Sequence, residues 1–257
     1  TEDTGSRNVA IGYEALKTQN VDSDAYNVAV GRGAGEAVTT GIQNTLVGGL
    51  SGDALTDADY NVALGYGALT EDTLGSRSVA VGTFSLVTQN FTTATNAYNV
   101  AVGYSAGNLI TTGIRNTLVG AIAGDAFTDA DDNVGIGDEA LSSDTLGSRS
   151  TAVGTNTLAT QNFTTATNAN NVAVGYNAGV VLTTGIRNTF VGADAGDTIT
   201  DADNNVAVGA LALSADTLGS QSIAIGRGAL KVQNFTTATN TLNTAVGYSA
   251  GESVTTG

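Results

Sequence analysis

The residues with the clearest potential for chemistry are aspartates that gather in three short segments of the sequence. The three groups have the same internal spacing and recur at one constant interval. They are Asp53, Asp57 and Asp59; Asp125, Asp129 and Asp131; and Asp197, Asp201 and Asp203. Clustered carboxylates on a loop are typical ligands of Ca²⁺, which takes about six to eight oxygen atoms. These aspartates are therefore candidate calcium ligands, with solvated acidic turns as the alternative, and their spacing matches no EF-hand.

Three phenylalanines mark a second candidate, a contact loop that recurs at the same interval as the aspartate groups. The loops contain Asn90-Phe91-Thr92, Asn162-Phe163-Thr164 and Asn234-Phe235-Thr236. A phenylalanine at the tip of such a loop could contact a partner, whereas one that folds back would cover the body of the protein. Each triplet also fits the acceptor pattern for N-glycosylation, which matters only in a secretory pathway that has this machinery.

Catalytic residues are hard to find in this sequence. It contains no histidine and no cysteine, and its only lysines are Lys17 and Lys231. A glycosidase built on carboxylates would be expected to show a pair that breaks the repeat, yet the aspartates belong to repeated segments. We therefore predict a protein that is not an enzyme and that has no catalytic residue and no organic cofactor.

The elements that position these loops are copies of one run, exemplified by Asn99-Val100-Ala101-Val102-Gly103. Some version of it recurs fourteen times, at steps of 17, 19 or 21 in the numbering. The closing glycines are Gly12, Gly31, Gly48, Gly65, Gly82, Gly103, Gly120, Gly137, Gly154, Gly175, Gly192, Gly209, Gly226 and Gly247. A fixed period with one short β-branched run per unit is typical of a solenoid of strands. We predict an all-β fold, a parallel β-solenoid or β-roll of about 14 coils of 17 to 21 residues, with a 72-residue super-repeat of four coils.

Both faces of the predicted strand are apolar, so both must be covered. The last aliphatic position, as in Val102, is apolar in every copy and is assigned to the core. The middle position is mostly alanine, and small residues permit close approach of a second chain. This predicts an oligomer face that contains Ala29, Ala101, Ala173 and Ala245. The asparagine that opens the run is expected to stack into a ladder of amides.

Composition excludes several classes of partner. The formal net charge of -15 argues against binding nucleic acid through a basic surface, and no apolar run is long enough to predict membrane insertion.

The unbroken periodicity of the sequence predicts one continuous repeat array over residues 1–257. Because the repeat is cut at both ends, we expect this array to be part of a longer fibre protein.

The unit Asn-[Val/Thr]-Ala-[Val/Ile]-Gly-x-x-Ala, as in Val100 to Ala106, resembles the head repeats of trimeric autotransporter adhesins, and its longer form resembles repeats of phage tail fibres. The resemblance covers essentially the whole chain. It implies a left-handed parallel β-roll in which three chains pack side by side. We therefore expect a structural segment of an extracellular fibre or adhesin, located at a cell surface or on a virion. Its expected partners are other copies of the same chain and a cell-surface receptor or glycan. Alternatives are a self-assembling extracellular filament and an ice-binding solenoid.

Overall fold

The structure of the protein, a computed structural model, describes residues 7–257. These residues form short strands and turns without any helix, and so contain no helical segment that could cross a membrane. The described residues form two compact units, residues 7–131 and 132–257, and each is described by itself. The single array over residues 1–257 stays a prediction, and residues 1–6 lie outside the described part.

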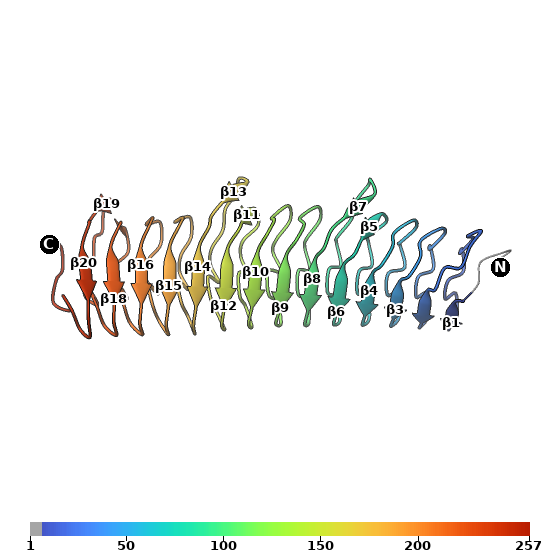
Figure 1. Cartoon of the computed structure of the whole chain (residues 1–257), viewed down its shortest axis with the longest axis horizontal. Coiled ribbons are helices and arrows are strands. Elements are labelled where there is room, and N and C mark those ends of the chain that lie inside the picture. Colours follow the sequence, from blue (N-terminus) through green and yellow to red (C-terminus); the bar gives the residue numbers. More distant parts are fainter. Residues whose placement is uncertain (1–6) are drawn as a thin grey trace. The chain divides into compact units, whose positions relative to one another are not determined.

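Unit 1 is a parallel β-solenoid in which each coil adds one strand to a wall (Figure 1). A small second sheet lies beside this wall. The wall strands are β1 (Val9–Ile11), β2 (Val28–Val30), β3 (Thr45–Val47), β4 (Val62–Leu64), β6 (Val79–Val81), β8 (Val100–Val102) and β9 (Thr117–Val119), and the small sheet pairs β5 (Gly75–Ser76) with β7 (Thr95–Asn96).

Unit 2 repeats this design. Its wall strands are β10 (Val134–Ile136), β12 (Thr151–Val153), β14 (Val172–Val174), β15 (Thr189–Val191), β16 (Val206–Val208), β18 (Ile223–Ile225) and β20 (Thr244–Val246). Two small sheets pair β11 (Gly147–Ser148) with β13 (Thr167–Asn168) and β17 (Gly219–Ser220) with β19 (Thr239–Asn240). The prediction of an all-β parallel solenoid is therefore confirmed, with about 14 turns over the two units.

Neighbouring coils within a unit are held in register by backbone pairing and by buried asparagines. Val79 pairs with Val100, and Ala101 with Leu118. The side-chain oxygen of Asn44 accepts a hydrogen bond from the backbone N–H of Asn61 at 2.9 Å, and the Asn44 amide donates to the carbonyl of Ala58 at 2.7 Å. The expected asparagine ladder is present between the coils that carry asparagine, and it satisfies buried backbone groups at the start of their strands, while Ser78, Ser150 and Ser222 interrupt the column.

The two faces of the wall are the reverse of what the sequence predicts. The middle residue of the strand points into the coil, and Ala29, Ala101 and Ala173 are completely buried, while Ala245 is 7% exposed. The alanines therefore do not form an outer oligomer face. The flanking valines point outward, so Val102 belongs to the surface rather than to the core. A coil of about 17 residues encloses a narrow interior, and small residues on the strand leave room there for buried leucines of the turns, such as Leu86 and Leu158.

Candidate functional site

The acidic corners lie on the coil turns, where their carboxylates bind the preceding coil. Asp59 accepts a hydrogen bond from the backbone N–H of Ile42 at 2.8 Å, and Asp57 accepts one from the hydroxyl of Thr40. The equivalent bonds recur, as between Asp203 and Ile186 at 2.8 Å. Asp59 and Asp203 thus cap backbone N–H groups and Asp57 accepts from a side chain, and all three contacts join one coil to the next, which is a structural role.

The predicted calcium ligands do not converge. Among residues 7–257, no group of three acidic side chains is placed so that it could hold a metal ion. Asp53, Asp57 and Asp59 share one turn, but the last two each face a separate donor on the coil before. The same division holds for Asp197, Asp201 and Asp203, and the third group, with Asp125, Asp129 and Asp131, has the same spacing. The geometry supports acidic turns, and calcium binding stays a prediction without support from it.

Asp197, like its equivalent Asp53, has an Oδ1 atom that is buried and accepts no hydrogen bond. Burial, followed by the nearby charge of Asp194, raises the pKa of Asp197 to about 6. An unfolded chain has an aspartate pKa of about 3.9, so the folded state binds the extra proton between these two values. The charged form therefore destabilises the fold above pH 6, and this penalty disappears as the pH falls toward 4.

Asp197→Asn is accordingly expected to raise the melting temperature of the protein near pH 7.5 and to confer no such gain near pH 4. Thermal unfolding over this pH range measures both effects. Asp138→Asn, which removes an exposed charge from the same unit, is the control. An equal gain from Asp197→Asn at both pH values would show that the buried charge is not the cause.

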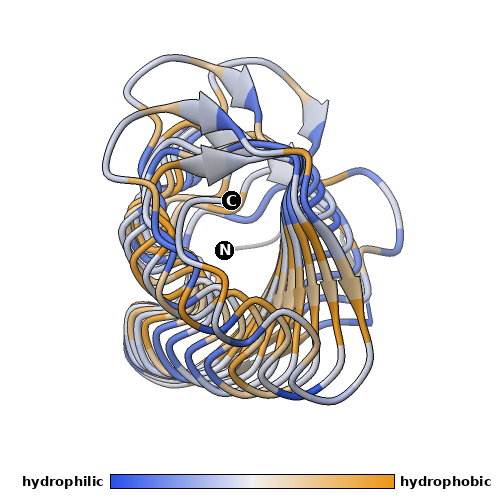
Figure 2. Cartoon of the chain, turned by 90° about the vertical axis from the view of Figure 1, so that its left-hand side faces the viewer, coloured by the Kyte–Doolittle hydropathy of each residue, from blue (hydrophilic) through white to orange (hydrophobic). Residues whose placement is uncertain are grey.

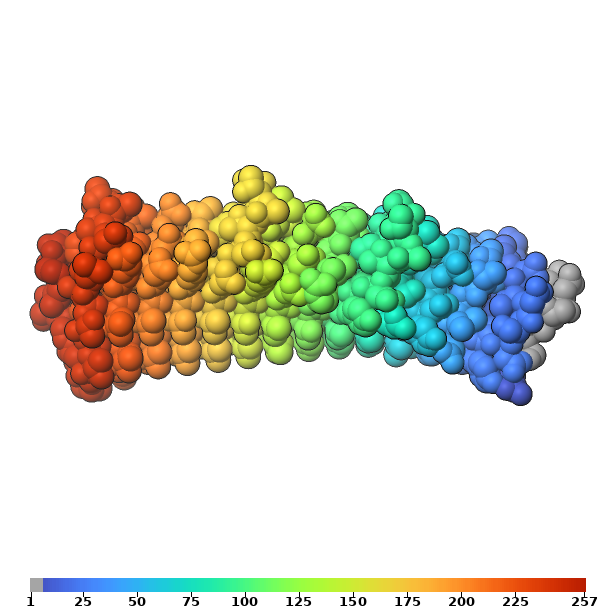
Figure 3. Space-filling model, turned by 45° about the horizontal axis from the view of Figure 1, so that its top comes forward, coloured from blue at the N-terminus to red at the C-terminus, as the bar shows by residue number. Residues whose placement is uncertain are grey.

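The predicted contact phenylalanines fold back instead of projecting. Phe91 and Phe163 are each 6% exposed, and Phe235 is half-buried. Their loops nevertheless stand out from the coil, because the residues after each phenylalanine form the outer strand of a small sheet (Figures 2 and 3). We call these segments, residues 92–96, 164–168 and 236–240, the first, second and third protrusions. Their exposed residues are threonine, alanine and asparagine rather than phenylalanine.

A buried carboxylate holds each protrusion in place. Asp144 is completely buried, and its Oδ1 accepts hydrogen bonds from the N–H groups of Gly147 at 3.0 Å and Phe163 at 3.1 Å. Its Oδ2 accepts from the amide of Gln161, whose oxygen accepts from Asn171 at 2.8 Å. Burial raises the pKa of Asp144, while the bonds from Gln161 and from the backbone oppose that rise. The same network joins Asp72 to Gln89 and Asp216 to Gln233, and it was not predicted from the sequence.

Two exposed columns that flank the wall are also absent from the predictions made from the sequence. Every arginine and every tyrosine of the chain lies either directly before the Asn or Ser that opens a strand run or directly after the glycine that closes one. The opening column contains Arg7, Tyr26, Tyr60, Arg77, Tyr98, Arg115, Arg149 and Arg187, and the closing column contains Tyr13, Arg32, Tyr66, Tyr104, Tyr176, Arg227 and Tyr248. All the tyrosines are exposed. Both residue types are enriched at binding surfaces, so this placement was a signal available in the sequence.

Within the opening column of unit 1, arginine and tyrosine side chains stack on one another. The guanidinium carbon of Arg77 lies 5.0 Å from the ring centre of Tyr60 and 5.9 Å from that of Tyr98. Arg7 lies 5.3 Å from the ring centre of Tyr26. Such pairs are weakly stabilising at exposed sites, so their main effect is to fix the orientation of the arginine.

Comparison with known proteins identifies no relative. No family model, curated protein or solved structure matches this chain. The resemblance to adhesin and tail-fibre repeats therefore stays a prediction from the motif.

Proposed function

We propose that this chain is a structural, non-enzymatic segment of an extracellular fibre or adhesin and that it works as a parallel homotrimer. The observation that carries this proposal is the outer face of each wall. In unit 2, this face presents two ranks of β-branched side chains, one before and one after each buried middle residue. Val172 and Val174 remain 38% and 37% exposed, and Ile223 and Ile225 are similar.

A flat apolar surface of this kind favours contact with another protein surface. Monomeric proteins rarely expose large contiguous apolar patches, and a patch bordered by tyrosine and arginine has the composition of an interface. Register between the coils of a unit makes the ranks regular, so identical chains can lie side by side along them. Three copies are what the motif resemblance implies, with the valine face in the place that the sequence analysis gave to the alanines.

Val172→Lys combined with Val174→Lys is expected to convert the oligomer into a monomer without unfolding it. Both side chains point outward, so the lysines remain solvated in a single chain but would be buried without a partner charge at an interface. Light scattering coupled to size-exclusion chromatography gives the mass, and circular dichroism gives the fold.

Thr164→Lys with Thr165→Lys is the matched control, because it adds the same charge to two exposed positions on the second protrusion of the same unit. This variant should keep the mass of the wild type. A monomeric wild-type protein, or an oligomer that tolerates lysines at both valines, would rule out the homotrimer.

A further inference from the structure

The three protrusions are identical in sequence but differ in what stands beside them. Each continues the run Phe-Thr-Thr-Ala-Thr-Asn, which begins at Phe91, Phe163 and Phe235. The opening-column residues around the first protrusion are Tyr60, Arg77 and Tyr98. Their equivalents are Asp132, Arg149 and Asn170 at the second protrusion and Asn204, Gln221 and Leu242 at the third. The first protrusion therefore differs from the other two by the two aromatic rings on either side of its arginine, whereas the second protrusion has the arginine alone.

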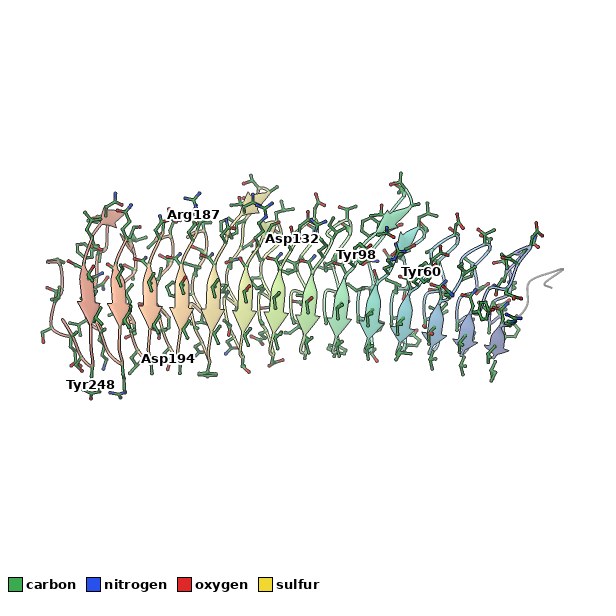
Figure 4. All side chains as sticks on the ribbon, in the orientation of Figure 1. Tyr60, Tyr98, Asp132, Arg187, Asp194 and Tyr248 are labelled. Carbon is green, nitrogen blue, oxygen red and sulfur yellow. The ribbon has the colours of Figure 1, made fainter. Side chains whose placement is uncertain are left out.

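Contacts fix this group against the protrusion. Arg77 directly follows β5, and its guanidinium donates a hydrogen bond to the side-chain oxygen of Asn96 in β7. Its backbone N–H donates to the carbonyl of Asp59 at 3.0 Å. Tyr60 and Tyr98 lie on the same edge of unit 1 as the small sheet (Figure 4) and are 44% and 51% exposed. Tyr60, Arg77, Tyr98 and Asn96 therefore form one exposed surface beside the threonine hydroxyls of the first protrusion.

The residues of the opening column have φ between 52° and 64°, a left-handed region that asparagine and aspartate tolerate best. Unit 2 has Asp132, Asn170 and Asn204 at such positions, but it also has larger residues there, such as Leu242. Positive φ is therefore a general feature of this column, and an asparagine in place of Tyr60 or Tyr98 suits the backbone at least as well.

We propose that Tyr60, Arg77 and Tyr98, together with the first protrusion, form a binding site for a carboxylated saccharide. The guanidinium of Arg77 lies close to both rings and donates to Asn96, and its remaining N–H groups form a fork that matches a carboxylate. Tyrosine supplies apolar ring surface and a hydroxyl, and Asn96 and the threonines supply partners for sugar hydroxyls. The net charge of -15 would repel a polyanion at most of the surface, so recognition depends on this local cation. This inference deepens the proposed adhesive role and rests on it.

The test is a titration of the protein with oligogalacturonate, which carries carboxylates, and with its neutral methyl ester. We expect the wild type to bind the acid and not the ester. Arg77→Gln should weaken binding about tenfold or more, because it removes a charge-assisted contact. Tyr60→Asn combined with Tyr98→Asn should abolish binding of the acid. It should leave the melting temperature unchanged or raise it, because asparagine suits the left-handed backbone conformation.

Arg149→Gln is the matched control, because Arg149 occupies the equivalent place at the second protrusion without flanking tyrosines. It should bind as the wild type does. The inference is wrong if oligogalacturonate, oligoguluronate and sialyllactose all fail to bind, if the methyl ester binds equally well, or if Arg149→Gln and Arg77→Gln lose the same affinity.

Oligomeric mass separates this inference from the proposed trimer. If Arg77→Gln dissociates the oligomer, the stacked residues belong to an interface between copies and the saccharide site is overturned. If the wild type is a monomer that binds oligogalacturonate, the saccharide site is supported and the homotrimer is ruled out.

Discussion

Gly103→Ala is expected to destabilise the protein by about 3 to 5 kcal/mol, although it adds a single methyl group. A Cβ atom at Gly103 would lie 2.2 Å from the carbonyl oxygen of Gly120 on the next coil, which is far inside contact distance. Its φ of 143° adds strain for any residue other than glycine. Relief requires the two coils to move apart, and that movement breaks the ladder between β8 and β9.

Gly247→Ala is the matched control for that experiment. Its φ is 130°, but among the residues that the structure describes a Cβ there would meet only the Cβ of Ala250, at 3.8 Å. Gly247→Ala should therefore lower the free energy of unfolding only by the cost of the strained backbone conformation, about 1 to 2 kcal/mol. Thermal unfolding followed by circular dichroism measures both. Equal losses would mean that backbone conformation alone, and not coil stacking, requires the glycine.

The glycine column explains why the fold could be predicted from the sequence. A residue type that returns at every turn at a nearly constant spacing gives the period, and the short β-branched run before Gly103 indicates a strand. The predicted register follows, because in-register stacking is what makes each glycine face the next.

The orientation of the wall could not be predicted in the same way. Alternation with period two shows that Ala101 and Val102 face opposite sides, but it does not say which side is inside when both residues are apolar. The larger size of the valine side chain was the only reason to place Val102, and not Ala101, in the core. The informative positions were Leu118 and Phe190, which replace alanine in the middle column and are completely buried. Large residues would be tolerated there only in the interior, so these exceptions pointed to the alanine side.

The candidate sites could likewise be predicted only in part from the sequence. Phe91 was a candidate contact residue because a loop excursion was visible in the sequence, but its direction depends on Asp72, whose oxygens hold the loop from inside. The stacked arrangement around Arg77 depends on neighbours from the coil before and the coil after, which only the stacking of coils brings together. A search for residue types restricted to one position of the repeat would have found it.

Asp144→Asn is expected to destabilise unit 2 by about 1 to 3 kcal/mol, even though the two side chains have the same shape. The new amide would place a donor against the Gln161 amide, which already donates to this position. Gln161 cannot escape by turning over, because its nitrogen would then face the amide of Asn171, which also donates to the carbonyl of Gly185 at 2.8 Å. One buried donor is therefore left without an acceptor.

Adding Gln161→Glu to Asp144→Asn should recover most of the lost stability. The exchanged pair restores an acceptor opposite the new amide and keeps one for Asn171, while the oxygen of that new amide can still accept from Gly147 and Phe163. Chemical denaturation of the wild type, both single variants and the double variant gives the coupling energy of the pair. Independent, additive losses would contradict the network. A recovered double variant would show that the direction of the donors, and not the site of the negative charge, is what holds the second protrusion in place.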